Sequence, residues 1–507
     1  MSSKTSKKAL KDLRRLTLDQ SINFLPLQKF LTQKFRLDKL QLHLLIEPRI
    51  INMLQASINP DLKNLVVKTS IYTNWVSPTD TRAHLLRLLS YFKLLQHLSL
   101  YPSLLQSTPQ NSLFLIPKLA KLKLLEWLQD GRTNCFPLFL LDPKISKYFT
   151  QLQDLSLLTP SWLPDHPLFS SLVPLHNLKA FSLTIPDSGP PSVDFTLLSK
   201  FQNLESFSLT VHSTVDLVIN DFAFLTNLKR FSFRKTTLTT SLYSSIITPD
   251  SIENLPKLES LEIISYFASP YDLAFYKNLA SKAPNIKALS IVLPSDSLNE
   301  LFEEASLNFS LEKFSLRIQR LTAPFIALSK NLSAFLKENP HFKNLELYFS
   351  DCYASFLEPI MKCVKSLTRL ETLKFGLRRP IELQDRKILL LKDVISKPED
   401  LRLIHLEFPQ HSFDSREVSG LVNSFMKLGR LERLALNTRF VKVSDESFGK
   451  FVEFVRNAKR IKSMKLRIKG CPEEKERELE KALGYDISYW GNPNMKISTI
   501  MNFGWVW

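Results

Sequence analysis

Apolar residues recur along the chain in a short fixed pattern, Leu-x-x-Leu-x-Leu, in which Phe and Ile often replace Leu. In the Leu-x-Leu part, two apolar side chains alternate with a polar one, so each copy predicts a short strand that buries one face. The clear copies begin at Leu95, Leu152, Leu178, Leu204, Leu228, Leu258, Ile286, Leu311, Phe342, Leu370, Leu403, Leu431 and Ile461.

Weaker copies at Leu37, Leu62 and Leu119 extend the series to 16 between positions 37 and 461, with a mean period of about 28 residues. A single copy can arise in any Leu-rich helix, but a long series at a bounded period indicates repeated structural units. One such strand cannot bury its apolar face alone. Stacked units are therefore predicted to join their strands into a parallel sheet over a continuous core.

The segments between the strands contain candidate helices. Residues 81–94, 323–337, 415–428 and 446–458 have apolar residues at spacings of three and four, which predicts helices. Capping boxes at Ser297–Glu300 and Asp414–Glu417 indicate helix starts. Residues 184–203, with three prolines, are expected to be irregular instead.

The repeated motif and its period resemble those of the leucine-rich repeat superfamily, in particular its intracellular, ribonuclease-inhibitor-like and F-box-associated members. The resemblance covers nearly the whole chain. It implies an α/β solenoid (a horseshoe) of about 16 repeats, with a concave parallel β-sheet and convex helices or irregular segments. The family usually places Asn or Cys three residues after the last strand Leu, whereas here that position holds Ser103, Pro160, Pro186 and Lys469 in four copies. We therefore expect a divergent solenoid.

Three segments follow from this pattern. Residues 1–36 are predicted to form a basic N-terminal tail and an N-terminal cap, and residues 37–470 to form the solenoid. Residues 471–507 are predicted to form a C-terminal cap helix and an aromatic tail. A solenoid needs such caps because each end exposes its core.

The net charge of +18 is unevenly distributed. Residues 1–15 carry +5, and residues 361–470 carry +12, from 25 Lys and Arg against 13 Asp and Glu. Such asymmetry favours an anionic partner near one or both ends. Ordinary solubilising surface charge is the alternative interpretation.

Seven basic residues are the leading candidates for this contact. By strand register, Arg433, Lys465 and Arg467 are expected on the concave face, and Arg378, Arg379, Arg439 and Lys442 just after strands on one rim. An acidic protein surface or phosphate groups could bind there. Trp505 and Trp507 are further candidates, either as partner anchors or as part of the C-terminal cap.

The residues expected at the middle of the concave face are mainly serines in the central strands, and serines rarely make strong contacts. The C-terminal part of this series is of mixed charge, and the expected residues include Lys123 in the copy at Leu119 and Glu407 in the copy at Leu403. His97 and His405 are expected at equivalent positions of the sheet. The sequence shows no visible interleaving of aromatic residues among the basic ones, as single-stranded RNA stacking requires.

The sequence predicts a protein without catalytic activity. It contains no HExxH, GxxxxGK[ST], GxGxxG or GxSxG motif, and its nine His and four Cys do not fall in metal-ligand spacings. No cofactor or metal is expected. The four cysteines form no CxxC pair, so free thiols in a reducing compartment are the simplest interpretation. Neither a signal core nor an apolar run of 18 residues occurs, so we expect a cytoplasmic or nuclear protein without a membrane contact.

A non-enzymatic scaffold for protein–protein interaction accounts best for these features. One alternative is a substrate-recognition adaptor of a ubiquitin ligase, because Phe24–Leu31 faintly resembles the opening of an F-box. Another is an RNA-associated subunit of a large particle, bound through the basic C-terminal repeats. The basic segment 1–15 is interpreted as a tail, a nuclear signal or a mitochondrial presequence.

Overall fold

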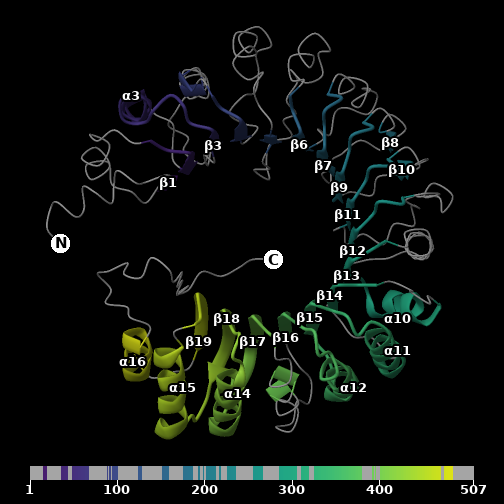
Figure 1. Cartoon of the computed structure of the whole chain (residues 1–507), viewed down its shortest axis with the longest axis vertical. Coiled ribbons are helices and arrows are strands. Elements are labelled where there is room, and N and C mark those ends of the chain that lie inside the picture. The colour runs from purple at the N-terminus through teal and green to yellow at the C-terminus, as the bar shows by residue number, and fades with distance from the viewer. Residues whose placement is uncertain are drawn as a thin grey trace, which may run out of the picture. The chain divides into compact units, whose positions relative to one another are not determined.

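The structure is a computed structural model of the chain (Figure 1), and it divides into two compact units, residues 1–257 and residues 258–507. The residues that the structure describes are 15–19, 36–43, 48–67, 88–89, 91–92, 94–100, 124–127, 151–158, 175–185, 192–194, 198, 201–212, 216–218, 225–235, 255–265, 285–304, 310–318, 325–378, 391–392, 394–395, 400–458, 460–469 and 473–482.

Unit 1 is built on parallel strands that follow one another in chain order. They are β1 (Arg15–Asp19), β2 (Lys39–His43), β3 (Asn64–Val67), β4 (His97–Leu100), β5 (Leu124–Trp127), β6 (Asp154–Leu158), β7 (Ala180–Ile185), β9 (Ser206–Val211) and β11 (Arg230–Lys235). Helix α3 (Pro48–Ser57) connects β2 to β3. A separate parallel pair, β8 (Ser192–Asp194) with β10 (Asp216–Val218), lies in the segments that return between the main strands.

Unit 2 repeats the same strand pairing and adds regular helices. Its strands are β12 (Ser260–Ser265), β13 (Ala288–Val292), β14 (Lys313–Ile318), β15 (Asn344–Ser350), β16 (Thr372–Arg378), β17 (Leu403–Phe413), β18 (Arg433–Phe440) and β19 (Ser463–Lys469). Its helices are α10 (Ser295–Glu304), α11 (Phe325–Glu338), α12 (Ala354–Val364), α14 (Ser415–Lys427), α15 (Asp445–Asn457) and α16 (Glu473–Ala482). In this unit the described helices all lie on one side of the sheet, and none of them covers its other face (Figure 1).

Alternation of apolar and polar residues explains both the strands and the core. Strands β7, β9 and β12 alternate between buried and half-buried residues along their length. The first Leu of each motif also points inward, as Leu178, Leu204 and Leu228 are 0% exposed. Because neighbouring strands pair in register, like side chains stack from repeat to repeat. The predicted parallel solenoid is therefore confirmed.

The helix predictions are mostly confirmed in unit 2, where residues 323–337, 415–428 and 446–458 correspond to α11, α14 and α15 within two residues at each end. The capping box of α14 is present, because Asp414 Oδ1 accepts the Glu417 N–H at 2.9 Å and Glu417 Oε2 accepts the Asp414 N–H. The start predicted at Ser297 is wrong, because α10 begins at Ser295. Most of the helix predicted at 81–94 lies outside the described residues.

Two predicted strand registers are wrong. At the copy beginning at Leu119, β5 pairs Leu98 with Leu125 and Ser99 with Glu126, so Glu126 and not Lys123 takes the middle position. At the copy beginning at Leu403, β16 pairs Lys374 with His405. That strand is therefore displaced by two residues from the prediction, and His405 replaces Glu407 at the middle.

Both errors occur in segments that contain more apolar residues than one copy of the motif requires. In residues 119–128 and in residues 401–408, the motif can be aligned with the sequence in two ways (two phases), and both place apolar residues at the motif's apolar positions. In the second segment Ile404, Leu406 and Phe408 are buried while Leu403 is only half-buried. The corrected register also shows that His97 and His405 are not equivalent, since His405 shares the middle position with Ser99 and His97 lies two residues earlier in its strand.

The strands begin before the first copy found in the sequence. β1 contains Leu16 and Leu18 and pairs in parallel with β2 over five residues. The segment 1–36, which was predicted as a tail and cap, therefore contributes a strand. The F-box-like residues 24–31 lie outside the described residues.

A ladder of alternating charges runs along the edge where the strands begin. From the copy at Leu178 onward, the residue after the opening apolar position of each motif is, in order, Lys179, Glu205, Lys229, Glu259, Lys287, Glu312, Lys343, Glu371, Arg402, Glu432 and Lys462. We call these residues the charge ladder. Within the units, ion pairs join Lys229 to Glu205, Lys287 to Glu259 and Lys343 to Glu312, each at 3.0 Å, and Lys462 to Glu432 at 2.8 Å.

The charged residues on both sides of Lys287, a member of this ladder, raise its pKa. The hydrogen bond that Lys287 donates to Glu259 and the charge of Glu259 raise the pKa of Lys287, and the charge of Glu312 contributes further. The basic residues of the ladder are thus next to acidic ones. This edge carries little net charge, although the chain as a whole is strongly basic.

Exchanging one ladder pair tests this alternation. The double variant Glu312→Lys with Lys343→Glu keeps one ion pair, but position 312 then carries a lysine beside Lys287. We expect a lower urea midpoint for this variant than for Glu312→Gln with Lys343→Gln, which removes the pair without creating a like-charge contact. Circular dichroism during urea unfolding measures both. A charge-exchanged variant as stable as the wild type would contradict an interacting ladder.

Candidate functional site

The open face of unit 2, defined as the side of β12–β19 away from the helices, is the main candidate surface. Its side chains come from alternate strand positions, which register places in columns from repeat to repeat. The middle column contains Glu262, Ser290, Ser315, Glu346, Lys374, His405, Ala435 and Lys465. The column two residues further along contains Arg317, Tyr348, Gly376, Glu407, Asn437 and Arg467.

This regular pairing of Leu-x-Leu strands, repeat after repeat, decides the fold. The chain has a leucine-rich repeat fold. The intracellular subclass that the sequence resembles rests on the motif and period alone.

Three comparisons with known proteins were made. No protein-family model matches the sequence, and neither does any curated protein sequence. Solved structures similar to this leucine-rich repeat chain include an internalin from Listeria monocytogenes, with 12% identity and a TM-score of 0.32 over 71% of this chain and 90% of that one.

Two further structures match over more of this chain. A chain of the Toll–Spatzle complex of Drosophila has 14% identity and a TM-score of 0.37, over 90% of this chain and 61% of that one. A chain of the TLR13–ssRNA13 complex has 16% identity and a TM-score of 0.36, over 93% of this chain and 64% of that one. This chain therefore spans less than two thirds of either of these two.

The structure brings several of the predicted basic residues onto the open face. Arg433 and Arg439 belong to β18 and Lys465 belongs to β19, and all three side chains are exposed at alternate positions of paired strands. Arg378 is the exposed last residue of β16 on the same face. Arg378 and Arg439 were expected after their strands, but Arg378 lies within β16 and Arg439 lies within β18, opposite Lys469.

Of the other predicted residues, the structure describes only some. Lys442 follows β18 with a positive φ of 52°, in a turn where its carbonyl oxygen accepts a hydrogen bond from Ser415 Oγ. Arg467 lies in β19 in register with Asn437, and its side chain is outside the described part of the structure. Arg379, Trp505 and Trp507 also lie outside the described residues.

Three basic residues of the open face differ from most of those of the charge ladder. Among the described residues, no ion pair involves Arg433, Arg439 or Lys465, whereas Lys343 and Lys462 each pair with a glutamate. Glu432, next to Arg433 in the chain, pairs instead with Lys462 at 2.8 Å, and its hydrogen bond with Lys462 lowers the pKa of Glu432. Three exposed cations without an ion pair among the described residues thus lie on the two neighbouring strands β18 and β19.

An aromatic and polar cluster, which sequence reasoning missed, lies on the same face. We call Arg317, Tyr348, Gly376 and His405 the Tyr348 cluster. The Arg317 guanidinium carbon lies 4.9 Å from the centre of the Tyr348 ring, and the His405 ring stands edge-on to it with centroids 6.5 Å apart. A cation over a tyrosine ring and an edge-on aromatic pair are both attractive arrangements.

Gly376 makes room for this ring. A Cβ at Gly376 would lie 2.4 Å from Tyr348 Cδ1, far inside the contact distance of two carbons. The ring therefore lies over the backbone of β16. No turn or positive φ requires glycine here, so its role is the close approach of a neighbouring side chain.

Charged groups surround the Tyr348 cluster. Glu346 Oε1 accepts a hydrogen bond from Lys374 at 2.9 Å and lies 3.9 Å from Lys313. Burial and the charges of Glu407 and Glu346 raise the pKa of Tyr348, so its hydroxyl stays protonated at neutral pH. Burial lowers the pKa of His405, so its imidazole is uncharged there.

No group of three His, Cys, Asp or Glu side chains that could hold a metal ion occurs in the part of the chain that the structure describes. Cys352 and Cys363 are buried, and burial raises the pKa of the Cys352 thiol to about 12. Among the described helices, none is long and apolar enough to cross a membrane.

Proposed function

We propose that the protein is a non-enzymatic scaffold that binds an acidic protein through the open face of unit 2. The observation that carries this proposal is the group of exposed cations on β18 and β19, Arg433, Arg439 and Lys465, for which the described residues provide no ion pair. Neighbouring strands lie about 4.8 Å apart, so the fields of these residues add.

The Tyr348 cluster supports a protein partner over a nucleic acid. Tyr348 is the aromatic residue that the described strands place on this face, and its ring already packs against Arg317 and Gly376. It is therefore poorly placed to stack on a base, as single-stranded binding requires. Tyr and Arg are also common anchors of protein interfaces.

A charge-reversal experiment tests the proposal. The variant Arg433→Glu, Arg439→Glu, Lys465→Glu removes the exposed cations of the open face. We expect its affinity for labelled poly-L-glutamate, measured by fluorescence anisotropy, to be at least tenfold lower than that of the wild type. In affinity purification after nuclease treatment, the same variant should lose acidic proteins that the wild type retains.

A matched control separates a specific surface from general charge. The variant Lys330→Glu, Arg369→Glu, Arg416→Glu changes the net charge by the same amount, and these exposed residues lie on α11, before β16 and on α14. It should bind as the wild type does. Equal losses in both variants would show that only net charge matters. A preference for a uridylate 20-mer over poly-L-glutamate, with a steep salt dependence, would replace the protein partner by RNA.

A further inference from the structure

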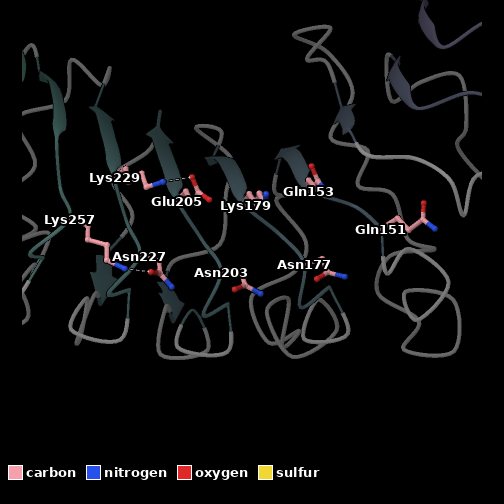
Figure 2. A pocket seen from close by; sticks show the side chains of 9 residues that line it. All are labelled: Gln151, Gln153, Asn177, Lys179, Asn203, Glu205, Asn227, Lys229 and Lys257. Atoms are coloured by element: carbon pink, nitrogen blue, oxygen red, sulfur yellow. Dashed lines mark hydrogen bonds and ion pairs between the residues drawn. The ribbon is translucent and has the colours of Figure 1, made fainter.

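A second surface, on the edge of unit 1 where the strands begin, has the form of a polar groove of about 650 Å³. Figure 2 shows its lining as two rows that run across successive repeats. One row consists of the residues before each opening Leu, Gln151, Asn177, Asn203, Asn227 and Lys257. The other consists of the residues after it, Gln153, Lys179, Glu205 and Lys229.

Buried leucines create the two rows. Leu152, Leu178, Leu204 and Leu228 are each 0% exposed, so both of their chain neighbours are directed outward at every repeat. The repeat spacing of about 4.8 Å then sets the spacing within each row. The groove is therefore a periodic surface, and a ligand that fits it has a matching period.

We call the amide residues of the first row, Gln151, Asn177, Asn203 and Asn227, the amide row. Two of them are anchored to backbone carbonyls but keep hydrogen-bonding capacity. Asn203 Nδ2 donates to the His176 carbonyl at 3.0 Å, and Asn227 Nδ2 donates to the Gln202 carbonyl at 2.8 Å. A primary amide has two N–H donors and one carbonyl acceptor, so each contact uses only part of the group. These anchored amides are thus held in position to donate to a ligand carbonyl.

The cations of the groove are incompletely neutralised. Lys229 pairs with Glu205 at 3.0 Å, and Lys257 donates to the neutral Asn227 Oδ1 at 2.7 Å, which does not cancel its charge. The lining holds three lysines and one glutamate. Lys179 and Lys229 lie two repeats apart in the same row, which corresponds to about 9.6 Å.

This spacing matches one extended polymer conformation. A polyproline II helix has three residues per turn and rises about 3.1 Å per residue, so side chains three residues apart recur every ~9.3 Å on one side. Its backbone carbonyls make no internal hydrogen bonds and accept them from a binding partner. A fully extended strand repeats its side chains about every 6.6 Å, which does not match two repeats.

We propose that this groove binds an acidic peptide segment in the polyproline II conformation, with carboxylates at every third residue. In this arrangement the carboxylates face Lys179 and Lys229, and the segment's backbone carbonyls accept hydrogen bonds from the amide row. This site is distinct from the open face of unit 2, and its test does not depend on that proposal.

Synthetic peptides of different spacing test the assignment with the full chain. The probe is fluorescein-labelled Glu-Pro-Pro-Glu-Pro-Pro-Glu, and the comparison peptides are Glu-Pro-Glu-Pro-Glu-Pro-Pro, with the same composition, and Lys-Pro-Pro-Lys-Pro-Pro-Lys. We expect the first to bind at least tenfold more tightly than either comparison peptide in fluorescence anisotropy. Equal affinity of the two acidic peptides would overturn the matched period.

Single-residue variants test whether the probe binds in this groove. Lys179→Glu should weaken the probe at least tenfold, and Asn203→Ala should weaken it several-fold. Lys330→Glu, on an exposed lysine of α11 in unit 2, should have no effect. Circular dichroism checks that each variant is folded. If the probe bound the folded Lys179→Glu variant as it binds the wild type, the groove would be excluded as its site. If a uridylate 20-mer bound more tightly than the peptide, and in a manner that depends on Lys179, a peptide would be excluded as the ligand.

Discussion

Phe314→Ala is expected to lower the free energy of unfolding by about 3–5 kcal/mol. Phe314 in β14 is 0% exposed and lies among three other aromatic rings. Its ring centroid is 5.0 Å from that of Phe335, 5.8 Å from Phe342 and 6.4 Å from Phe302. The substitution removes apolar burial and leaves a cavity between a strand and two helices. This cavity cannot close unless the stacked repeats shift.

Urea unfolding followed by circular dichroism measures this loss. Ile326→Ala is the matched control, because Ile326 is 72% exposed at the start of α11 and a change there should stay within about 0.5 kcal/mol. Repeat proteins unfold in segments, so the loss should appear in the transition that includes unit 2. A loss for Phe314→Ala no larger than that for Ile326→Ala would contradict the packing around β14.

Gly376→Ala is expected to be destabilising by about 1–3 kcal/mol, although alanine suits a strand better than glycine does. The new methyl group would overlap Tyr348 Cδ1, at 2.4 Å. Either the ring leaves its place over β16 and loses Arg317 and His405, or the strand is displaced. Both outcomes cost stability.

A double variant separates this overlap from an effect on the strand itself. Tyr348→Ala removes the ring, so adding Gly376→Ala to that variant should be neutral or slightly stabilising. Chemical unfolding of the wild type, the two single variants and the double variant gives the coupling free energy. If Gly376→Ala cost the same in both backgrounds, the glycine would not be required by Tyr348.

The strands could be predicted because each Leu-x-Leu motif carries its own burial pattern. The prediction failed in β5 and β17, where additional apolar residues such as Leu125 and Ile404 allow a second phase of the same motif. Only pairing with the neighbouring strand selects one phase, as when Lys374 aligns with His405. Local patterning thus identifies a strand more reliably than its register.

The candidate surfaces were predictable to different degrees. Arg433 and Lys465 could be assigned to the sheet face from their position relative to the buried residues of their own strands. The contact of Tyr348 with Gly376 could not, because it joins residues 28 positions apart through the register of β15 and β16. The charge ladder was visible in the sequence and was missed, because the motif directs attention to apolar positions and not to the residues that follow them.

The charge ladder has a consequence for how such a chain can change in length. Its period is two repeats, whereas the fold itself repeats with every strand. Loss of the single repeat that contains Glu312 would place Lys287 next to Lys343, and duplication of that repeat would place two glutamates together. Gain or loss of two adjacent repeats keeps every neighbour opposite in charge. We therefore expect the insertion or deletion of two adjacent repeats to be tolerated better than that of a single repeat.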